Sequence, residues 1–274
     1  MTTRTLRLLG IYGLLLLGSA IVLGPVYLAL INALLPSGEV ASYPPNVLPK
    51  GFGIGSFGDA WDTVPMGRYL VNSLIMATGI TVLQIATSVL AGYALACMRF
   101  PGRTLVFVLF IGSLMVPWEV SIVPNFQTVR SFGWLDSYQG LIIPFAATGL
   151  GIFLLRQQFM TIPSELRDAA AMDGYGHLRF LWSVGIPLAR PAIGSLAVFS
   201  FLSAWNQYLW PLLVTNNDDY RTVQIGLSLL SRGEIDRVNV VMAGTIIALL
   251  PTLILLLVFQ RQLVRGLTAG AVKG

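Results

Sequence analysis

Six long apolar blocks restrict the fold of this chain more than any other feature. They cover about residues 6–31, 70–98, 104–124, 139–160, 192–214 and 240–260. A helix needs roughly 20 apolar residues to cross a bilayer core of about 30 Å, and each block is long enough. Because 55% of the 274 residues are hydrophobic and only 11% are charged, a soluble core could not hide them all. The sequence predicts an all-α membrane protein, with six transmembrane helices in one domain over residues 1–274.

The first block has the position of a signal peptide. Its apolar run from Leu8 to Leu35 is longer than the apolar region of a typical signal peptide, and it lacks a clear small-residue cleavage site. We therefore expect this block to remain as the first membrane helix.

The distribution of charged residues predicts the orientation. If both ends lie on one side of the membrane, that side holds 11 of the 17 basic residues and three of the 12 acidic residues. Cytoplasmic segments carry an excess of Lys and Arg, so both termini are expected in the cytoplasm. The net charge of +5 then reflects orientation, and no nucleic-acid partner is expected.

Several kinds of chemistry are excluded by what the chain lacks. Cys97 and His177 are its single cysteine and single histidine, so neither an internal disulfide nor a zinc cluster is expected. A Ser-His-Asp set is implausible for the same reason. No G-x-x-x-x-G-K-[ST] run occurs, so the chain should not bind ATP through a P-loop. We expect a non-catalytic chain that binds no cofactor or metal ion.

A polar segment at 161–191 interrupts the apolar blocks and is far longer than the typical connection of about 4–6 residues. Ser164 follows Pro163 and is placed to cap a helix whose first turn carries Glu165 and Asp168. Acidic residues in the first turn favour a helix because they complement its dipole. The segment therefore begins with a predicted short helix.

The rest of the segment predicts a second short helix. The first helix should end near Asp173, where Gly174 supplies a backbone conformation that other residues resist. The second is expected from about Gly176 to Val184, ending before Pro187. Two short helices at an angle would form a compact helix-turn-helix knob, whose small and acidic residues suit contact with a partner. An ordinary solvated loop is the alternative interpretation.

The spacing within the segment resembles a known signature. Asp168-Ala169-Ala170 is followed after three residues by Gly174, and after nine more by Val-Gly-Ile-Pro at 184–187. This pattern resembles the E-A-A, three residues, Gly, nine residues, I-x-L-P motif of the permease subunits of ATP-binding cassette (ABC) importers. Asp replaces Glu at 168, Val replaces Ile at 184 and Ile replaces Leu at 186. The resemblance implies ATPase-coupling roles for Glu165, Asp168, Ala169, Ala170, Asp173, Gly174 and Pro187.

The wider chain is similar to the second permease subunit of sugar-type importers, including its tail at 259–274. This resemblance implies a heterodimer with a second permease and a dimer of ATPase subunits that bind ATP and Mg²⁺. It also implies an extracytoplasmic substrate-binding protein, docking on outer loops at 36–69 and 215–239. The Pro- and Gly-rich composition of the first of these loops predicts an irregular structure. The implied location is the inner membrane of a bacterium, as a multi-pass protein in contact with lipid.

Three stretches resemble the importer permeases for glycerol-3-phosphate or glycerophosphodiesters. They are P-W-E-V at 117–120, L-D-S-Y at 135–138 and W-N-Q-Y-L-W-P at 205–211. The resemblance implies a glycerol phosphate cargo such as glycerophosphocholine. A maltose-like or trehalose-like oligosaccharide is the alternative cargo.

Polar and aromatic residues in these stretches and beside them are candidates for the substrate path. The spacing of Ser203, Asn206, Gln207 and Trp210 predicts one shared helix face, and amides facing lipid are costly. Glu119 lies between two prolines, where an irregular helix is expected. The full set of candidates is Trp118, Glu119, Ser203, Asn206, Gln207, Tyr208 and Trp210. Packing or gating is the alternative role for these side chains.

Other functional classes explain the sequence less well. A secondary transporter usually carries buried carboxylates for ion coupling, whereas the middles of these blocks are nearly free of Asp and Glu. A membrane enzyme would need a catalytic set at one interface, and none is visible. Two further amides, Asn72 and Gln84, are expected to serve packing.

Overall fold

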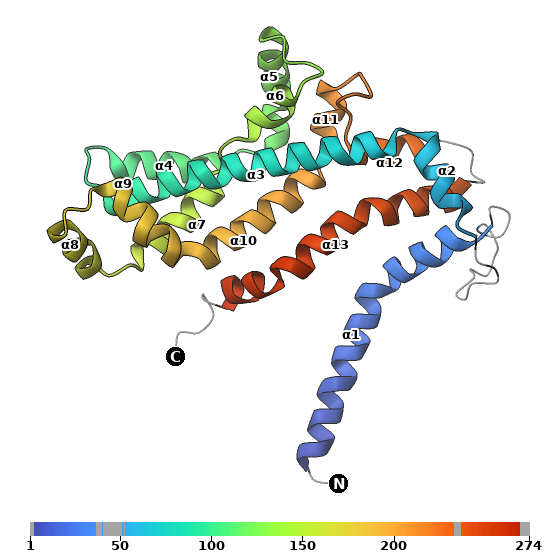
Figure 1. Cartoon of the computed structure of the whole chain (residues 1–274), viewed down its shortest axis with the longest axis horizontal. Coiled ribbons are helices and arrows are strands. Elements are labelled where there is room, and N and C mark those ends of the chain that lie inside the picture. Colours follow the sequence, from blue (N-terminus) through green and yellow to red (C-terminus); the bar gives the residue numbers. More distant parts are fainter. Residues whose placement is uncertain (1–2, 37–39, 41–50, 52, 233–236, 269–274) are drawn as a thin grey trace. The chain divides into compact units, whose positions relative to one another are not determined.

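The computed structural model describes residues 3–36, 40, 51, 53–232 and 237–268, with side chains from residue 7 to 260 (Figure 1). The described residues form helices and connections, with no strand among them. The chain divides into two compact units, Met1–Gly67 with Gly226–Leu250, and Arg68–Ile225 with Pro251–Gly274. A single permease domain over 1–274 stays a prediction.

The first unit contains α1 (Thr3–Leu34), α2 (Gly55–Thr63) and the first part of α13 (Val238–Thr268). α2 lies inside the segment for which an irregular loop was expected; residues 37–39, 41–50 and 52 of that loop lie outside the described part. The Asn239 side chain donates hydrogen bonds to Oγ of Ser56, at 2.9 Å, and to the carbonyl of Leu35, at 3.4 Å. This buried amide therefore joins the start of α13 to α2 and to the end of α1.

The second unit is built on α3 (Met66–Cys97), α4 (Arg103–Ser113), α7 (Gly149–Met160) and α10 (Ile186–Trp205). α7 packs against both α4 and α10. α3 and α7 approach so closely at Gly92 that a Cβ there would lie 2.9 Å from the backbone nitrogen of Arg156. Glycine at such a contact lets membrane helices pack with their backbones nearly touching.

Short helices complete the second unit. α5 (Trp118–Ser131) and α6 (Tyr138–Ile142) both contact α11 (Leu209–Val214), and a 3₁₀ turn at Ile143–Phe145 follows α6. α8 (Ser164–Met172) and α9 (His177–Phe180) form the knob, which we define as residues 164–185. α12 (Val223–Leu230) contains the boundary between the two units after Ile225, and it lies within the predicted outer loop at 215–239, of which residues 233–236 are outside the described part.

Four described helical segments are long and apolar enough to cross a membrane: Arg7–Leu34, Met66–Cys97, His177–Trp205 and Val238–Gln260. Two bent pairs bring the number up to six: α4 with α5, bent by 99°, and Tyr138–Phe145 with α7, bent by 47°. The six predicted spans are therefore compatible with the helices, although two are not straight. The tail at 269–274 lies outside the described residues.

Three of the expected continuous helices are broken, so these predictions of helix bounds were wrong. The block at 104–124 breaks before Pro117, because a proline disfavours helical backbone in the residue before it. The block at 139–160 breaks at the extended Thr148, before α7 begins. The block at 192–214 is interrupted after Trp205. There Pro211 has no N–H to donate to the carbonyl four residues earlier, and its ring would clash with it.

Candidate coupling surface and substrate path

The first helix of the knob ends at the predicted glycine. The amide nitrogens of Asp173 and Gly174 donate to the carbonyls of Ala169 and Ala171, at 3.1 and 3.0 Å, and close the last turn of α8. Gly174 then adopts a φ of +76°, the left-handed region that favours glycine. A Cβ at Gly174 would meet no atom within 4 Å, so backbone strain alone limits substitution there.

Two details of the knob differ from the sequence-based expectation. Ser164 is the first helical residue of α8 and makes no cap; Pro163 precedes it, and no side chain caps this end. The second helix does not end before Pro187. It passes from α9 through a π-helical turn at Leu181–Gly185 into α10, and Pro187 lies in the first turn of that helix, where a missing N–H is tolerated.

The exposed face of the knob combines acidic and apolar side chains. Glu165, Asp168 and Asp173 are exposed, as the coupling interpretation requires. Met172 is 85% exposed and Leu178 is 67% exposed, although both are large apolar residues. Sequence reasoning missed these two, and the signal available was an apolar residue within a polar segment. Exposed apolar side chains rimmed by charges are typical of a protein–protein contact.

The two alanines of the motif do not share a face. Ala169 is exposed, whereas Ala170 is 9% exposed and packs into the core of the second unit. The expectation that both alanines face a partner was therefore wrong for Ala170. Its carbonyl accepts a hydrogen bond from the Tyr175 amide at 2.8 Å, so it supports the turn from inside.

An aromatic cluster holds the knob against α3 and α7. The ring of Tyr93 lies 5.7 Å from that of Phe159, edge to face, and 6.3 Å from that of Phe180. The Tyr93 hydroxyl lies 3.2 Å from Nδ1 of His177, at the start of α9. Tyr93, Phe159 and Phe180 are buried, and aromatic pairs contribute about 0.5–1.5 kcal/mol beyond the area they bury. The knob is therefore a packed part of the second unit.

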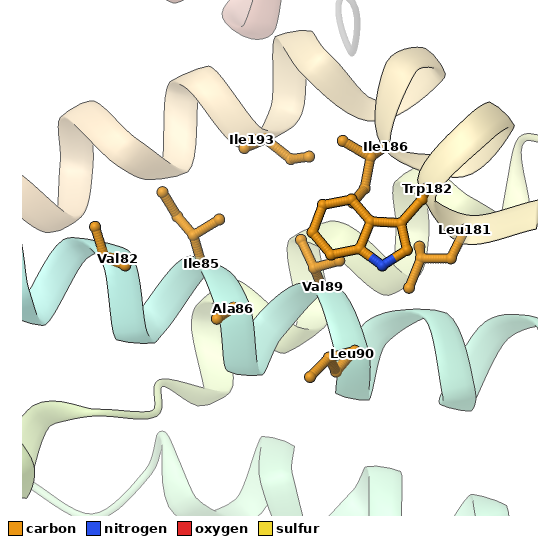
Figure 2. A pocket seen from close by; sticks show the side chains of 9 residues that line it. All are labelled: Val82, Ile85, Ala86, Val89, Leu90, Leu181, Trp182, Ile186 and Ile193. Carbon is orange, nitrogen blue, oxygen red and sulfur yellow. The ribbon is translucent and has the colours of Figure 1, made fainter. Parts of the chain in front are cut away.

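A hollow of about 350 Å³ lies beside the base of the knob, between α3 and the start of α10 (Figure 2). Every side chain that lines it is apolar or aromatic: Val82, Ile85, Ala86, Val89, Leu90, Leu181, Trp182, Ile186 and Ile193. A sugar phosphate would leave its hydroxyls and charge without hydrogen bonds in such a hollow. This hollow is therefore unsuited to be the substrate path.

Three aromatic rings meet where α5, the 3₁₀ turn and α11 converge. The ring of Trp118 lies 4.6 Å from that of Phe145 and 5.6 Å from that of Trp210. Trp210 is 2% exposed, and its indole N–H donates to the carbonyl of Gly140 at 3.0 Å. Its ring and its donor are both used in packing, which is the alternative role given for this residue, and a part for Trp210 in the substrate path stays a prediction. Trp118 is half-buried.

The predicted polar face on one continuous helix was also wrong, because α10 ends at Trp205. Ser203, Asn206 and Tyr208 are exposed around this break, and Gln207 is half-buried. The side-chain oxygen of Gln207 is itself buried and accepts no hydrogen bond from the described residues. The break therefore collects polar groups at one place, although on irregular backbone.

Glu119 lies in the first turn of α5 and is exposed. The irregularity expected between Pro117 and Pro124 lies just before this region, at the bend between α4 and α5. Pro124 is inside α5. The carboxylate therefore stands beside the bend, where no described cation pairs with it.

The L-D-S-Y stretch is a structural element. Asp136 has a φ of 51°, and its carboxylate accepts hydrogen bonds from the amides of Asn216 and Asn217. The Ser137 hydroxyl accepts from the Gly140 amide at 3.2 Å and so caps α6. The Tyr138 hydroxyl donates to Oδ1 of Asn72 at 2.7 Å. These contacts hold the loop at 216–217 and α3 against the start of α6.

Sequence reasoning missed the network that holds residues 216–222. The amide of Asn72 donates to the carbonyls of Asp219 and Arg221, at 2.8 and 2.9 Å, as a packing group should. The Tyr69 hydroxyl donates to Asp218 at 2.6 Å, and Arg221 pairs with the same carboxylate at 2.8 Å. Partial burial lowers the pKa of Arg221, but hydrogen bonds with Tyr69 and Asp218 raise it overall. The second predicted packing amide, Gln84, donates to the carbonyl of Phe145 at 2.9 Å.

α3 connects the two regions. Tyr69 and Asn72 hold the loop near its start, and Tyr93 holds the knob near its end. Tyr69 and Tyr93 are 24 positions apart, about 36 Å along a helix, which exceeds the roughly 30 Å of a bilayer core. The loop and the knob therefore belong to opposite sides of the membrane. Which side faces the cytoplasm stays a prediction from the charges.

Comparison with known proteins identifies relatives over most of the chain. Residues 67–269 match the family described as "Binding-protein-dependent transport system inner membrane component". The chain is 38% identical to the sn-glycerol-3-phosphate transport system permease protein UgpE of Yersinia pestis bv. Antiqua (strain Antiqua), over 93% of each chain. It is 37% identical to the protein of the same name in Escherichia coli O1:K1 / APEC, again over 93% of each.

A solved structure supports the fold. The crystal structure of a bacterial ABC transporter involved in the import of the acidic polysaccharide alginate contains a chain that matches with a TM-score of 0.81. The match covers 95% of this chain and 98% of that one, at 24% identity. At this identity the likeness establishes the all-helical fold and leaves the cargo to other evidence.

Proposed function

This chain belongs to the family of binding-protein-dependent transport system inner membrane components, and we propose that it couples a separate ATPase to the import of a glycerol phosphate compound. It is a permease component of an ABC importer and a protein of the inner membrane. Membership of this family rules out the alternative that the chain is a secondary transporter.

The knob carries the coupling part of the proposal. Its exposed acidic residues and the apolar Met172 and Leu178 suit an ATPase surface with a basic rim around an apolar groove. ATP and Mg²⁺ would bind to that partner. A second permease would complete the translocation path.

Force on the knob has a continuous route into the membrane helices. The route runs from α9 through Phe180 to Tyr93 on α3 and Phe159 on α7, and through the π-helical turn into α10. Closely packed interiors transmit displacement because they have few voids to absorb it. Movement of the ATPases would thus turn α3, α7 and α10 together and change access to the path.

The cargo part rests on the relatives that are 38% identical over 93% of their length. We place the path at the break after Trp205, where Asn206 and the unpartnered oxygen of Gln207 offer hydrogen bonds to hydroxyls. The same region would be lined by Trp118, Glu119, Ser203 and Tyr208. The buried Trp210 would hold the ring of Trp118 in place. Glu119 would repel a phosphate, so it suits the hydroxyl end of the cargo or a cation on a partner.

Docking of a substrate-binding protein would use the fixed loop at 216–222. Its hydrogen bonds to Asn72 and Tyr69 give the loop a defined shape before a partner arrives. A preorganised surface loses less entropy on binding.

The test is ATPase activity of the assembled importer in lipid, with its binding protein. The complex is titrated in turn with glycerophosphocholine, glycerol-3-phosphate, maltose and trehalose. Stimulation by a glycerol phosphate compound alone is the expected result. Stimulation by a disaccharide would keep the importer and overturn the cargo, and a complex that purifies without any ATPase would overturn the coupling role.

A further inference from the structure

A basic pocket lies at the turn between α3 and α4. Its volume is about 420 Å³, and Arg99, Phe100, Gly102, Arg103 and Thr104 line it. Arg103 donates a hydrogen bond to the carbonyl of Met98 at 3.2 Å. No acidic side chain among the described residues forms an ion pair with either arginine. The pocket therefore carries two positive charges that the described part of the chain does not neutralise.

An apolar groove follows the pocket along α4. This groove of about 370 Å³ is lined by Val106, Leu109, Phe110 and Ser113. Val106 and Phe110 lie three and seven positions after Arg103, so the arginine shares their helix face. From Arg103 to Ser113 the helix rises about 15 Å, half of the roughly 30 Å hydrocarbon core. The pocket and the groove thus form one surface with a charged end and an apolar length.

The depth of this surface in the membrane follows from the helices. α3, which ends at Cys97, is long and apolar enough to span the membrane, and α4, which begins at Arg103, is the first part of the bent pair that could form the next span. The pocket is therefore at the level where hydrocarbon gives way to lipid headgroups, and the groove runs inward across one leaflet. This placement does not depend on the proposed cargo or ATPase.

We propose that this surface is a binding site for one anionic phospholipid. The phosphate lies between Arg99 and Arg103, and an acyl chain follows Val106, Leu109 and Phe110. Basic pockets at the ends of membrane helices bind anionic headgroups because a phosphate can take charge-assisted hydrogen bonds there. A soluble glycerol phosphate would satisfy the arginines but leave the groove uncovered. A zwitterionic lipid would fill the groove, but the positive group of its headgroup would lie close to the arginines and be repelled.

The experiment is native mass spectrometry of the full chain assembled with its partner chains, titrated with phosphatidylglycerol or phosphatidylcholine. One phosphatidylglycerol should bind in preference to phosphatidylcholine. The R99Q/R103Q double variant should bind it about 25-fold more weakly, at about fivefold for each charge. R99K/R103K should keep the affinity. Arg190→Gln is the matched control, because Arg190 is exposed on α10 and lines neither the pocket nor the groove.

One further double variant tests the groove without altering charge. V106A/L109A should weaken binding of long-chain phosphatidylglycerol and leave that of the dihexanoyl form unchanged. The comparison of the two lipid forms with V106A/L109A tests the lipid site even if R99Q/R103Q fails to assemble.

Four outcomes would overturn the proposal. They are equal loss in Arg190→Gln, equal binding of phosphatidylcholine, displacement of the lipid by millimolar glycerol-3-phosphate, and lipid binding found only when the ATPase is removed. The third would assign the pocket to a free phosphate, and the fourth would make it a protein interface.

Discussion

Tyr93 is a buried residue in the last turns of α3, and its hydroxyl lies 3.2 Å from Nδ1 of His177 at the start of α9. The two rings also meet at an angle, with centroids 6.1 Å apart. Tyr93 is buried and His177 is exposed, so this contact joins the interior of the second unit to the surface of the knob. It is a direct polar link between a helix long enough to span the membrane and the proposed ATPase-binding surface.

Tyr93→Phe should remove that link while keeping the ring among Phe159 and Phe180. Loss of one hydrogen bond costs about 0.5–1.5 kcal/mol, so the unfolding midpoint should fall slightly and uptake per ATP hydrolysed should fall with it. A double-mutant cycle with His177→Ala, followed by thermal unfolding, measures the coupling energy. Additive effects of the two changes would show that the contact contributes nothing.

Gly92→Ala should destabilise the protein because its Cβ would press on the backbone of Arg156. The expected loss is about 1–3 kcal/mol, the usual cost of overpacking. Gly112→Ala is the matched control, since a Cβ at that helical position meets nothing within 4 Å. Unfolding in detergent should separate the two variants, and equal midpoints would contradict the close packing of α3 on α7.

Gln207→Leu should change the response to substrate and leave stability unchanged, whereas Trp210→Phe should lower stability and leave the response to substrate unchanged. Gln207→Leu removes an oxygen without a described partner, so stability should hold while the substrate concentration for half-maximal ATPase stimulation rises about tenfold. Trp210→Phe leaves the Gly140 carbonyl without its donor, which costs about 1–3 kcal/mol of stability and leaves that concentration unchanged. If Trp210→Phe shifted the titration and Gln207→Leu did not, our placement of the path would be wrong.

Met172→Ser should weaken the association of the permease with its ATPase. An apolar anchor at the centre of an interface contributes about 2 kcal/mol or more, so we expect at least about a tenfold loss of affinity. Met115→Ser is the control, because Met115 is 84% exposed but lies at the bend before α5. Affinity between purified subcomplexes provides the measurement, and an unchanged value for Met172→Ser would remove it from the interface.

The sequence was a good guide to some features of the molecule and a poor one to others. The apolar blocks and the glycine after α8 were predictable because span length and positive φ depend on local composition. The irregularity near Pro117 was predictable from the proline, whereas the breaks at Thr148 and after Trp205 were missed because they do not lower the hydropathy of their blocks. The burial of Trp210 and the role of Asp136 depend on residues distant in the chain, Gly140 and Asn216. No local pattern contains those pairings.

The measurement that tests the coupling account most directly is the ratio of uptake to ATP hydrolysis for Gly174 variants in reconstituted vesicles. A non-glycine residue in the left-handed region costs about 1–2 kcal/mol, and asparagine tolerates that region better than most residues. Gly174→Trp should therefore assemble and hydrolyse ATP but transport little, whereas Gly174→Asn should keep most of its transport. Unchanged uptake per ATP in a normally assembled Gly174→Trp variant would contradict the account.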